Sequence, residues 1–187
     1  LYSTRLIDTN AKASILEITN IQKGFGKRKN YLHIAIAPTK NMDRLEWFLE
    51  KGVEIGIDEI TFIQCINSER TKINMERCNK IIISAIKQSL KAYLPKLNPI
   101  VGFNDFIKGN HSVEAKSIGF LGTGKSMPIT DIHKNKNSHI VCIGPEGDFS
   151  IEEVQLAKEN GFQCISLGDS RLRTETAGVV ASTLINL

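Results

Sequence analysis

The stretch that decides the fold reads Ile140-Val141-Cys142-Ile143-Gly144-Pro145-Glu146-Gly147, followed by a helix start at Ser150. A second apolar run, Ile165-Ser166-Leu167-Gly168, leads through another loop into the C-terminal helix. Strand–loop–helix junctions form the ligand crevice of open α/β sheets, because backbone N–H groups and helix dipoles face it. Gly144 and Gly147 lack a Cβ atom, so we expect a ligand to approach the backbone there.

The rest of the chain alternates strand-like and helix-like patterns. The strand-like runs are His33–Ala37, Glu59–Cys65, Pro99–Phe103 and Lys116–Leu121. One helix is expected to start at a capping box formed by Asp43 and Glu46. A second is expected from about Met75 to Tyr93, and Asp131–Ser138 is expected to be a polar loop. This order predicts an α/β fold with a mainly parallel sheet flanked by helices.

Composition is typical of one globular domain: 187 residues, 41% hydrophobic and 24% charged. No apolar run approaches ~20 residues, so no membrane span is expected. The net charge of +4 permits nucleic-acid binding without requiring it. The four cysteines show no Cys-x-x-Cys spacing, which favours buried, reduced thiols. Because the chain opens at Leu1, we expect that a further N-terminal segment precedes it.

Two other kinds of site are disfavoured by their context. Gly119-Phe120-Leu121-Gly122-Thr123-Gly124-Lys125-Ser126 matches the phosphate-binding pattern G-x-x-x-x-G-K-S, but Pro128 follows at once and no amphipathic helix begins at the lysine. His33, His111, His133 and His139 are scattered without Asp or Cys at ligand spacing. We therefore expect neither nucleotide hydrolysis nor a metal site or a histidine-based triad.

Two C-terminal motifs resemble the uridine-N3 methyltransferases of 16S ribosomal RNA, the RsmE type of the SPOUT superfamily. They are Ile143-Gly144-Pro145-Glu146-Gly147 and Leu167-Gly168 with Leu172-Arg173-Thr174-Glu175-Thr176-Ala177. Two lesser stretches also fit: Leu45-Glu46-Trp47 with Lys51-Gly52-Val53-Glu54-Ile55-Gly56, and Gln88-Ser89 with Pro95. The resemblance covers roughly residues 33 to 187.

The resemblance implies a domain organisation and a cofactor. Residues 1–30 would be the tail of a PUA-like, RNA-binding β-barrel, and residues 31–187 a SPOUT domain whose C-terminal part forms a trefoil knot. S-adenosylmethionine would lie across three loops. The residues implied in cofactor binding are Leu121, Gly122, Thr123, Ile143, Gly144, Pro145, Glu146, Gly147, Leu167, Gly168, Leu172, Thr176 and Ala177.

Methylation at N3 of uridine requires loss of the N3 proton, and negative charge then spreads onto the uracil oxygens. Arg173 is the candidate cation that stabilises this charge. Glu175 is the candidate that orients Arg173 or takes the proton, and Glu146 is a second candidate base. The structural alternative is an Arg173–Glu175 ion pair at the start of the last helix, where an acidic residue favours the positive dipole end.

RNA contacts are expected from basic residues outside these loops. Lys23-Gly24-Phe25-Gly26-Lys27-Arg28-Lys29 is a glycine-rich basic loop, which fits phosphate contacts or a solvated turn equally well. The candidate RNA-binding residues are Lys23, Lys27, Arg28, Lys29, Arg70, Lys91 and Arg171. The family usually has arginine at the Lys91 position, which puts that residue's role in question.

The expected function is methyl transfer from S-adenosylmethionine to N3 of one uridine in 16S ribosomal RNA. The alternative is a catalytically inactive RNA-binding module of the same fold. The expected partners are 16S RNA or the 30S subunit, and no membrane. A homodimer is expected because the last helix carries Val179, Val180, Leu184, Ile185 and Leu187 on more than one face. The expected location is the cytoplasm.

Overall fold

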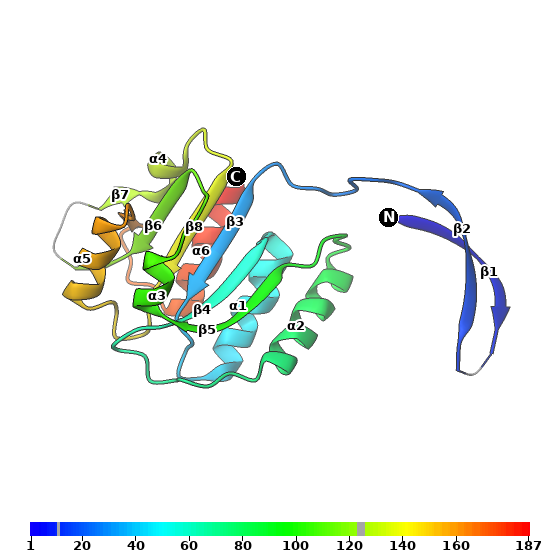
Figure 1. Ribbon diagram of the computed structural model, residues 1–187, viewed down its shortest axis with the longest axis horizontal. Coiled ribbons are helices and arrows are strands. Elements are labelled where there is room, and N and C mark those ends of the chain that lie inside the picture. The colour runs from blue at the N-terminus through cyan, green and yellow to red at the C-terminus, as the bar shows by residue number, and fades with distance from the viewer. Residues whose placement is uncertain (11, 123–125) are drawn as a thin grey trace.

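The centre of the molecule is a seven-stranded parallel sheet, seen in a computed structural model that describes residues 1–10, 12–122 and 126–187 (Figure 1). The order of its strands is β5-β4-β3-β8-β6-β9-β7. Their bounds are β3 (Tyr31–Ile36), β4 (Glu59–Gln64), β5 (Lys96–Gly102), β6 (Ala115–Gly119), β7 (Met127–Pro128), β8 (Ser138–Ile143) and β9 (Gln163–Ser166). The prediction of an α/β fold with a parallel sheet is confirmed.

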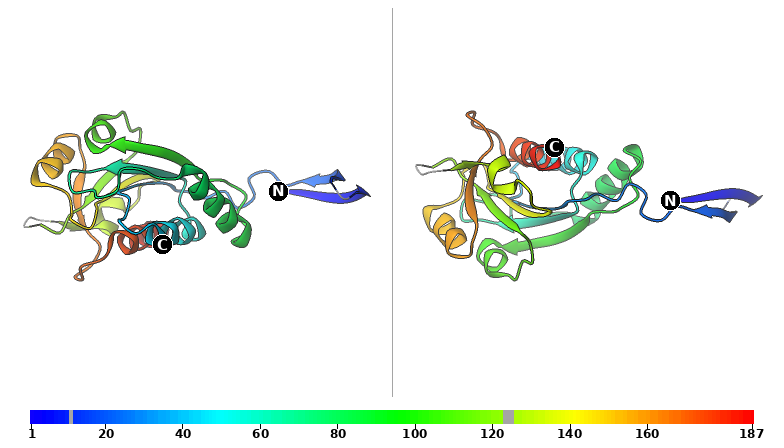
Figure 2. Two further views of the ribbon diagram at one scale, coloured as in Figure 1. Left: turned by 90° about the horizontal axis from the view of Figure 1, so that it is seen from below. Right: turned by 90° about the horizontal axis from the view of Figure 1, so that it is seen from above.

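Helices cover both faces of the sheet (Figure 2). On one face lie α1 (Met42–Ile55), α2 (Met75–Gln88) and α6 (Thr174–Asn186), with the short α4 (Ile129–His133) against α6. On the other lie α3 (Phe103–Lys108) and α5 (Ile151–Glu159). Each face has its own hydrophobic cluster. Because both sides of the central strands are buried, β3 and β8 are apolar runs rather than alternating ones.

The N-terminal residues form a separate antiparallel hairpin of β1 (Tyr2–Thr9) and β2 (Ser14–Ile21). It projects away from the sheet and its helices (Figure 2), and every described residue of both strands is exposed. Large apolar side chains in the hairpin are each more than half exposed: Tyr2, Leu6, Ile7, Ile15, Leu16, Ile18 and Ile21.

Two helix ends differ from the prediction. The cap of α1 is Asn41, whose Oδ1 accepts from the N–H of Asp43, so the expected Asp43 capping box is wrong. The helix α2 ends at Gln88 and not at Tyr93. Ser89 Oγ donates to the backbone oxygen of Ala85, and Leu90 adopts a φ of 53°, which turns the chain out of the helix.

Smaller departures concern α4 and the cysteines. Residues 131–133 belong to α4, although a polar loop was expected over Asp131–Ser138, because Ile129 and Ile132 are buried against α6 and the sheet. Ser126 is followed by β7 and not by a helix, which agrees with the rejection of the phosphate-binding loop. The four cysteines are free thiols, three of them buried and Cys164 half-buried in β9.

Candidate cofactor and RNA site

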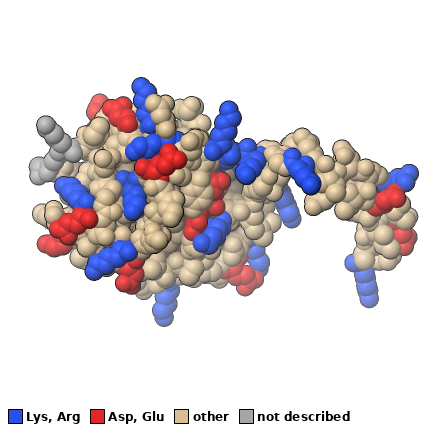
Figure 3. All heavy atoms as spheres, turned by 45° about the horizontal axis from the view of Figure 1, so that its top comes forward, with Lys and Arg blue, Asp and Glu red and all other residues tan. Residues whose placement is uncertain are grey.

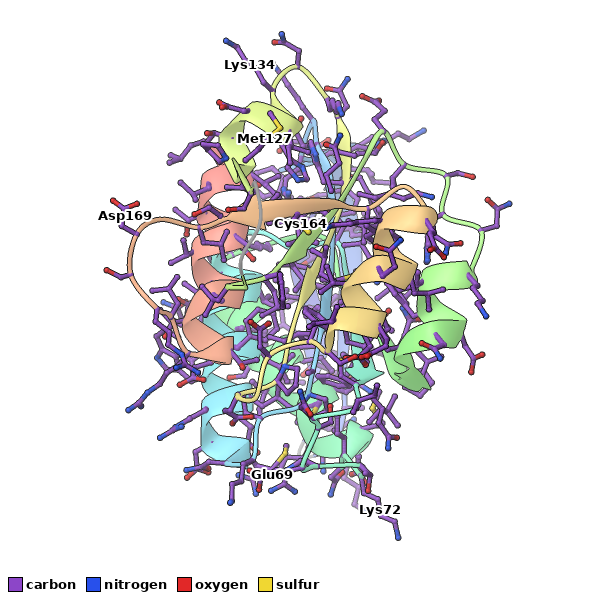
Figure 4. The ribbon with its side chains drawn as sticks, turned by 90° about the vertical axis from the view of Figure 1, so that its left-hand side faces the viewer. Glu69, Lys72, Met127, Lys134, Cys164 and Asp169 are labelled. Atoms are coloured by element: carbon purple, nitrogen blue, oxygen red, sulfur yellow. The ribbon has the colours of Figure 1, made fainter. Side chains whose placement is uncertain are left out.

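A cavity of about 370 Å³ lies at the carboxyl ends of β6, β8 and β9, where ligands bind open α/β sheets. Its walls are the loops that follow these strands and the first turn of α6. Figure 4 shows one of these loops, marked by Asp169, reaching outward from β9 beside α6. The lining residues are Gly119, Phe120, Leu121, Gly122, Ser126, Ile143, Gly144, Pro145, Glu146, Asp148, Ile165, Ser166, Leu167, Gly168, Ser170, Arg171, Leu172, Arg173, Thr174 and Ala177.

Hydrogen bonds fix the three loops relative to one another. Asp148, at a φ of 62°, accepts from the backbone N–H of Leu121 over 3.1 Å. Thr174 Oγ1 donates to the backbone oxygen of Gly144 over 2.9 Å. Glu146 Oε1 accepts from the N–H of Lys40 over 2.9 Å, which brings in the loop after β3. Loops from four parts of the chain are therefore held around one cavity.

The glycines of the second loop make room for the protein's own side chains. A Cβ on Gly144 would lie 3.0 Å from the Phe149 ring, and one on Gly147 would lie 3.0 Å from Asn67 Cβ. Gly147 does not line the cavity. The expectation that both glycines admit a ligand was therefore wrong for Gly147. Gly168 has a φ of 125°, a conformation that side chains rarely adopt.

A second hollow of about 580 Å³, here called the α1–α6 groove, adjoins the cavity. It lies between α1 and the start of α6, and the segment 171–173 lines both hollows. The groove is lined by Asp43, Arg44, Trp47, Arg171, Leu172, Arg173, Glu175 and Thr176. A cofactor in the cavity and a substrate in the groove would thus meet at Arg173.

The two candidate catalytic residues differ in their surroundings. Glu175 is buried, with 6% of its surface exposed, whereas Arg173 is exposed at the N-cap of α6. Within the described ranges, the cation nearest to Glu175 is Arg44, with Nε 3.7 Å from Oε1. The ion pair between Arg173 and Glu175, which was the structural alternative to a catalytic role, is not formed among these residues. Arg44 was missed because it lies 131 positions away in the sequence.

Comparisons with known proteins identify the family. An RNA methyltransferase domain family matches residues 27–186. Ribosomal RNA small subunit methyltransferase E of Mesomycoplasma hyopneumoniae is 32% identical over 188 residues, which are 97% of this chain and 79% of that protein. This chain is an RsmE-type RNA methyltransferase domain of the SPOUT superfamily.

Solved structures agree with this RsmE-type assignment. A probable rRNA methyltransferase from Porphyromonas gingivalis has a TM-score of 0.88 and 38% identity, over 98% of this chain and 78% of that one. Ribosomal RNA small subunit methyltransferase E from Neisseria gonorrhoeae, bound to S-adenosyl methionine, has a TM-score of 0.84 and 28% identity, over 97% and 76%.

With three exceptions, the predicted cofactor residues of this RsmE-type domain lie together around the cavity. Ten of them line the cavity, as the residue names above show. Gly147 packs against Asn67, Thr176 lines the α1–α6 groove, and Thr123 lies outside the described residues. The sequence missed Asp148 and Thr174, whose roles are hydrogen bonds across loops. The available signal for Asp148 was its position in the sequence, directly after the motif that ends at Gly147.

The predicted RNA-binding residues fall into separate groups. Lys27, Arg28, Lys29 and Lys91 line one cavity of about 370 Å³ where the hairpin segment joins the body, and Figure 3 shows basic side chains gathered there. Arg28 lies 3.2 Å from Asp58 and is half-buried. Lys23 is exposed. Arg171 lines the cofactor cavity and the groove.

Arg70 has a structural role that the sequence did not indicate. Its guanidinium donates to the backbone oxygens of Thr39 and Lys40, over 3.1 and 2.6 Å. Lys40 in turn donates to Glu146. Arg70 therefore holds the loop that positions Glu146, and two of its five N–H donors serve this structural contact.

Two further surveys cover the described part of the chain. Within residues 1–10, 12–122 and 126–187, no helix is long and apolar enough to span a bilayer. In the same ranges, no three His, Cys, Asp or Glu residues are grouped to hold a metal ion.

Proposed function

We propose that this domain transfers a methyl group from S-adenosylmethionine to N3 of one uridine in the 16S RNA of the small ribosomal subunit. The observation that carries the proposal is that Arg171, Leu172 and Arg173 line both the cofactor cavity and the basic α1–α6 groove. The family's relatives include one named for small-subunit ribosomal RNA and one bound to S-adenosyl methionine.

The chemistry of the cavity suits S-adenosylmethionine. Gly144, Leu167 and Ala177 offer backbone groups and apolar surface for an adenosyl group. Glu146 and Asp148 offer carboxylates for a cationic tail, and Arg171 offers a guanidinium for a carboxylate. When bound, this group supplies a methyl carbon on a positively charged sulfur, and no metal is needed. Leu121, Gly122, Ile143, Pro145, Gly168 and Leu172 complete the proposed cofactor residues.

Arg173 and Glu175 are proposed as the residues that act on the substrate. Arg173 stands where the cavity and the groove meet, so its guanidinium can stabilise negative charge on a uracil oxygen. Glu175 and Glu146 remain the two candidate proton acceptors. Glu175 lines the groove, whereas Glu146 lines the cavity and is tied to Lys40.

Two assays test this function. Calorimetry should show S-adenosylmethionine binding to the chain as given. Small-subunit RNA incubated with enzyme and cofactor should then stop reverse transcriptase at one uridine, because a methyl group on N3 blocks Watson–Crick pairing. Cofactor binding without such a stop on any small-subunit RNA would contradict the proposed reaction. RNA binding with no cofactor binding at millimolar concentration would instead support the inactive RNA-binding module.

The proposed domain division places residues 1–30 in an RNA-binding, PUA-like barrel and residues 31–187 in the methyltransferase domain. Its support is the hairpin, whose apolar pairs, such as Leu6 and Leu16, are exposed. Removing residues 1–22 should leave the melting temperature and the cofactor affinity unchanged, because the hairpin projects from the body. It should weaken RNA binding, because it removes most of what the chain holds of the proposed RNA-binding barrel. A loss of cofactor binding would contradict the division.

A homodimer, a trefoil knot and a cytoplasmic location belong to the same proposal. Val179, Val180 and Leu184 on α6 are partly exposed, which favours burial against a second copy.

The C-terminal helix α6 packs against α1 and β3, which come early in the domain, and this arrangement supports a knotted path of the chain. Ribosomal RNA as substrate supports the location. Sedimentation that gives a monomer at tens of micromolar would contradict the dimer.

A further inference from the structure

The α1–α6 groove contains the one tryptophan of the chain. Trp47 lies on α1 with 42% of its surface exposed. Such exposure is unusual for an indole ring, which buries a large apolar area when it finds a partner. Aromatic rings at the wall of a basic groove are platforms on which nucleobases stack. Trp47 therefore offers a flat apolar surface to a ligand that enters the groove.

Glu175 marks the place where this ligand would donate a hydrogen bond. The side chain is buried, with 8% of its surface exposed, and its Oε2 has no hydrogen-bond partner among the described residues. The nearest cation, Arg44, stands at 3.7 Å from Oε1, which is too long for a hydrogen bond. A buried carboxylate oxygen without a donor is costly. A ligand N–H in the groove would satisfy it.

Two arginines in the groove are free to bind phosphate. Neither the Arg171 nor the Arg173 side chain has a hydrogen bond or ion pair within the described ranges, and both are exposed. The groove holds three arginines against the carboxylates of Asp43 and Glu175. Guanidinium groups bind phosphate through paired, charge-assisted hydrogen bonds. The charge of the groove therefore fits one nucleotide of a nucleic acid.

We propose that the α1–α6 groove receives the target uracil, with its ring against Trp47 and its N3–H donated to Glu175. The proposal rests on the function proposed above and assigns the proton acceptor that it left open between Glu175 and Glu146. The N3 proton passes to a carboxylate oxygen of Glu175, and the electron pair of the N–H bond stays on N3. Arg173 faces the resulting negative charge from the border with the cavity.

Arg44 is a positioning residue in this arrangement. Its guanidinium, with Nε 3.7 Å from Oε1, attracts the Glu175 carboxylate and so orients it beside the groove. A protein partner would account for an exposed tryptophan equally well, but it would not account for an unpartnered acceptor flanked by two unpaired arginines. A uracil edge supplies the N–H donor, and its phosphate supplies the anion.

The test uses Trp47 itself, because it is the only tryptophan and reports stacking directly. A uridine pentanucleotide and a cytidine pentanucleotide are titrated into the full chain, and quenching of indole fluorescence is measured. Cytosine N3 carries no proton and would face Glu175 as a second acceptor. Wild-type protein should be quenched by the uridine chain at concentrations about ten- to a hundredfold lower.

Four variants sharpen this result. Glu175→Gln can donate to cytosine N3, so the preference for uridine should fall to near one. Glu152→Gln is the control. Glu152 is the second residue of α5, as Glu175 is the second residue of α6, and this variant should keep the wild-type preference for uridine. Arg44→Gln should lower the preference for uridine, because the Glu175 carboxylate loses the neighbour that orients it, and Arg44→Lys should restore most of that preference.

Each contrary outcome is distinct. Equal quenching by the two chains, or an unchanged preference in Glu175→Gln, would overturn the assignment of Glu175. Absence of quenching, with indole emission that shifts on dilution to the monomer, would make the groove a subunit interface. Methylation of small-subunit RNA without uridine preference would defeat this inference alone. Uridine-selective quenching without methylation of such RNA would instead defeat the proposed function.

Discussion

Thr174 Oγ1 and the backbone oxygen of Gly144 are joined by a 2.9 Å hydrogen bond between the start of α6 and the loop after β8. Both residues line the cofactor cavity. Thr174→Val keeps the shape and removes the donor, so the free energy of unfolding should fall by about 1 kcal/mol. Cofactor affinity, measured by calorimetry, should fall several-fold as the two walls lose alignment. Thr174→Ser keeps the hydroxyl and should behave as wild type.

Arg173→Ala should cut turnover by about 10²–10³-fold, the usual effect of removing one donor that stabilises developing charge. The melting temperature should not change, because the side chain is exposed and has no partner among the described residues. Arg173→Lys should recover only part of the rate, since a point charge cannot present two parallel donors. Normal single-turnover transfer in the alanine variant would dismiss the catalytic role, and lost cofactor binding with lost stability would point to an anchoring role.

Gly178 on α6 allows close contact with α1. A Cβ at this position would lie 2.5 Å from Cε2 of Phe48, whose ring is fully buried. Gly178→Ala should therefore lower the free energy of unfolding by about 1–3 kcal/mol, although alanine favours helices. Urea denaturation measures this loss. Ser182→Ala, on the same helix, is the control. Gly161→Ala would not serve, because Gly161 has a φ of 84° and any side chain would be strained there. Equal stability of Gly178→Ala and wild type would contradict the close contact.

Buried histidines should make the protein sensitive to mild acid. Burial lowers the pKa of His33 and that of His133 to about 4, and each is neutral in the fold. Unfolded histidine binds a proton near pH 6.5, so the unfolded state binds more protons between pH 6.5 and 4. The free energy of unfolding should therefore fall as pH falls through this window, by up to about 1.4 kcal/mol per pH unit for each histidine.

The pH effect is checked by urea denaturation at several pH values. His33→Gln removes one of the two titrations while its amide can still reach Thr61, the present partner of the ring. The slope of the free energy of unfolding against pH should decrease by one proton's contribution. An identical slope in the variant would show that His33 takes no part.

Two helix starts show how far local sequence signals can be trusted. The helix α5 begins at Ser150, as expected, and the structure adds a capping box there: Ser150 Oγ accepts from the N–H of Glu153, and the Glu153 carboxylate accepts from the N–H of Ser150. The same spacing at Asp43 and Glu46 failed. Asn41 already caps α1, and Glu46 pairs with Arg77 of α2. Asn41, itself a preferred N-cap residue, caps the helix two positions upstream of Asp43. The Glu46 carboxylate, which the capping box would have used, is held by a residue of another helix.

The site shows a similar division between local and distant signals. The cofactor loops could be predicted because each is a continuous motif at the end of a strand, as at Gly144 and Gly168. The groove could not, because Arg44 and Glu175 meet only through the packing of α1 on α6. Arg70 was assigned to RNA on its charge, yet the backbone oxygens of Thr39 and Lys40 hold it.

The position of β3 has a consequence for synthesis of the chain. This strand begins the domain, yet it lies between β4 and β8, and its residue Ile36 pairs with Ile143. A nascent chain leaving the ribosome thus carries β3 with one neighbour missing until much of the domain has been translated. Phe48 on α1 stays uncovered still longer, until Gly178 has emerged. Parallel pairing over such distances is slow, so we expect the domain to fold only after α6 has left the ribosome, with chaperones shielding its first half.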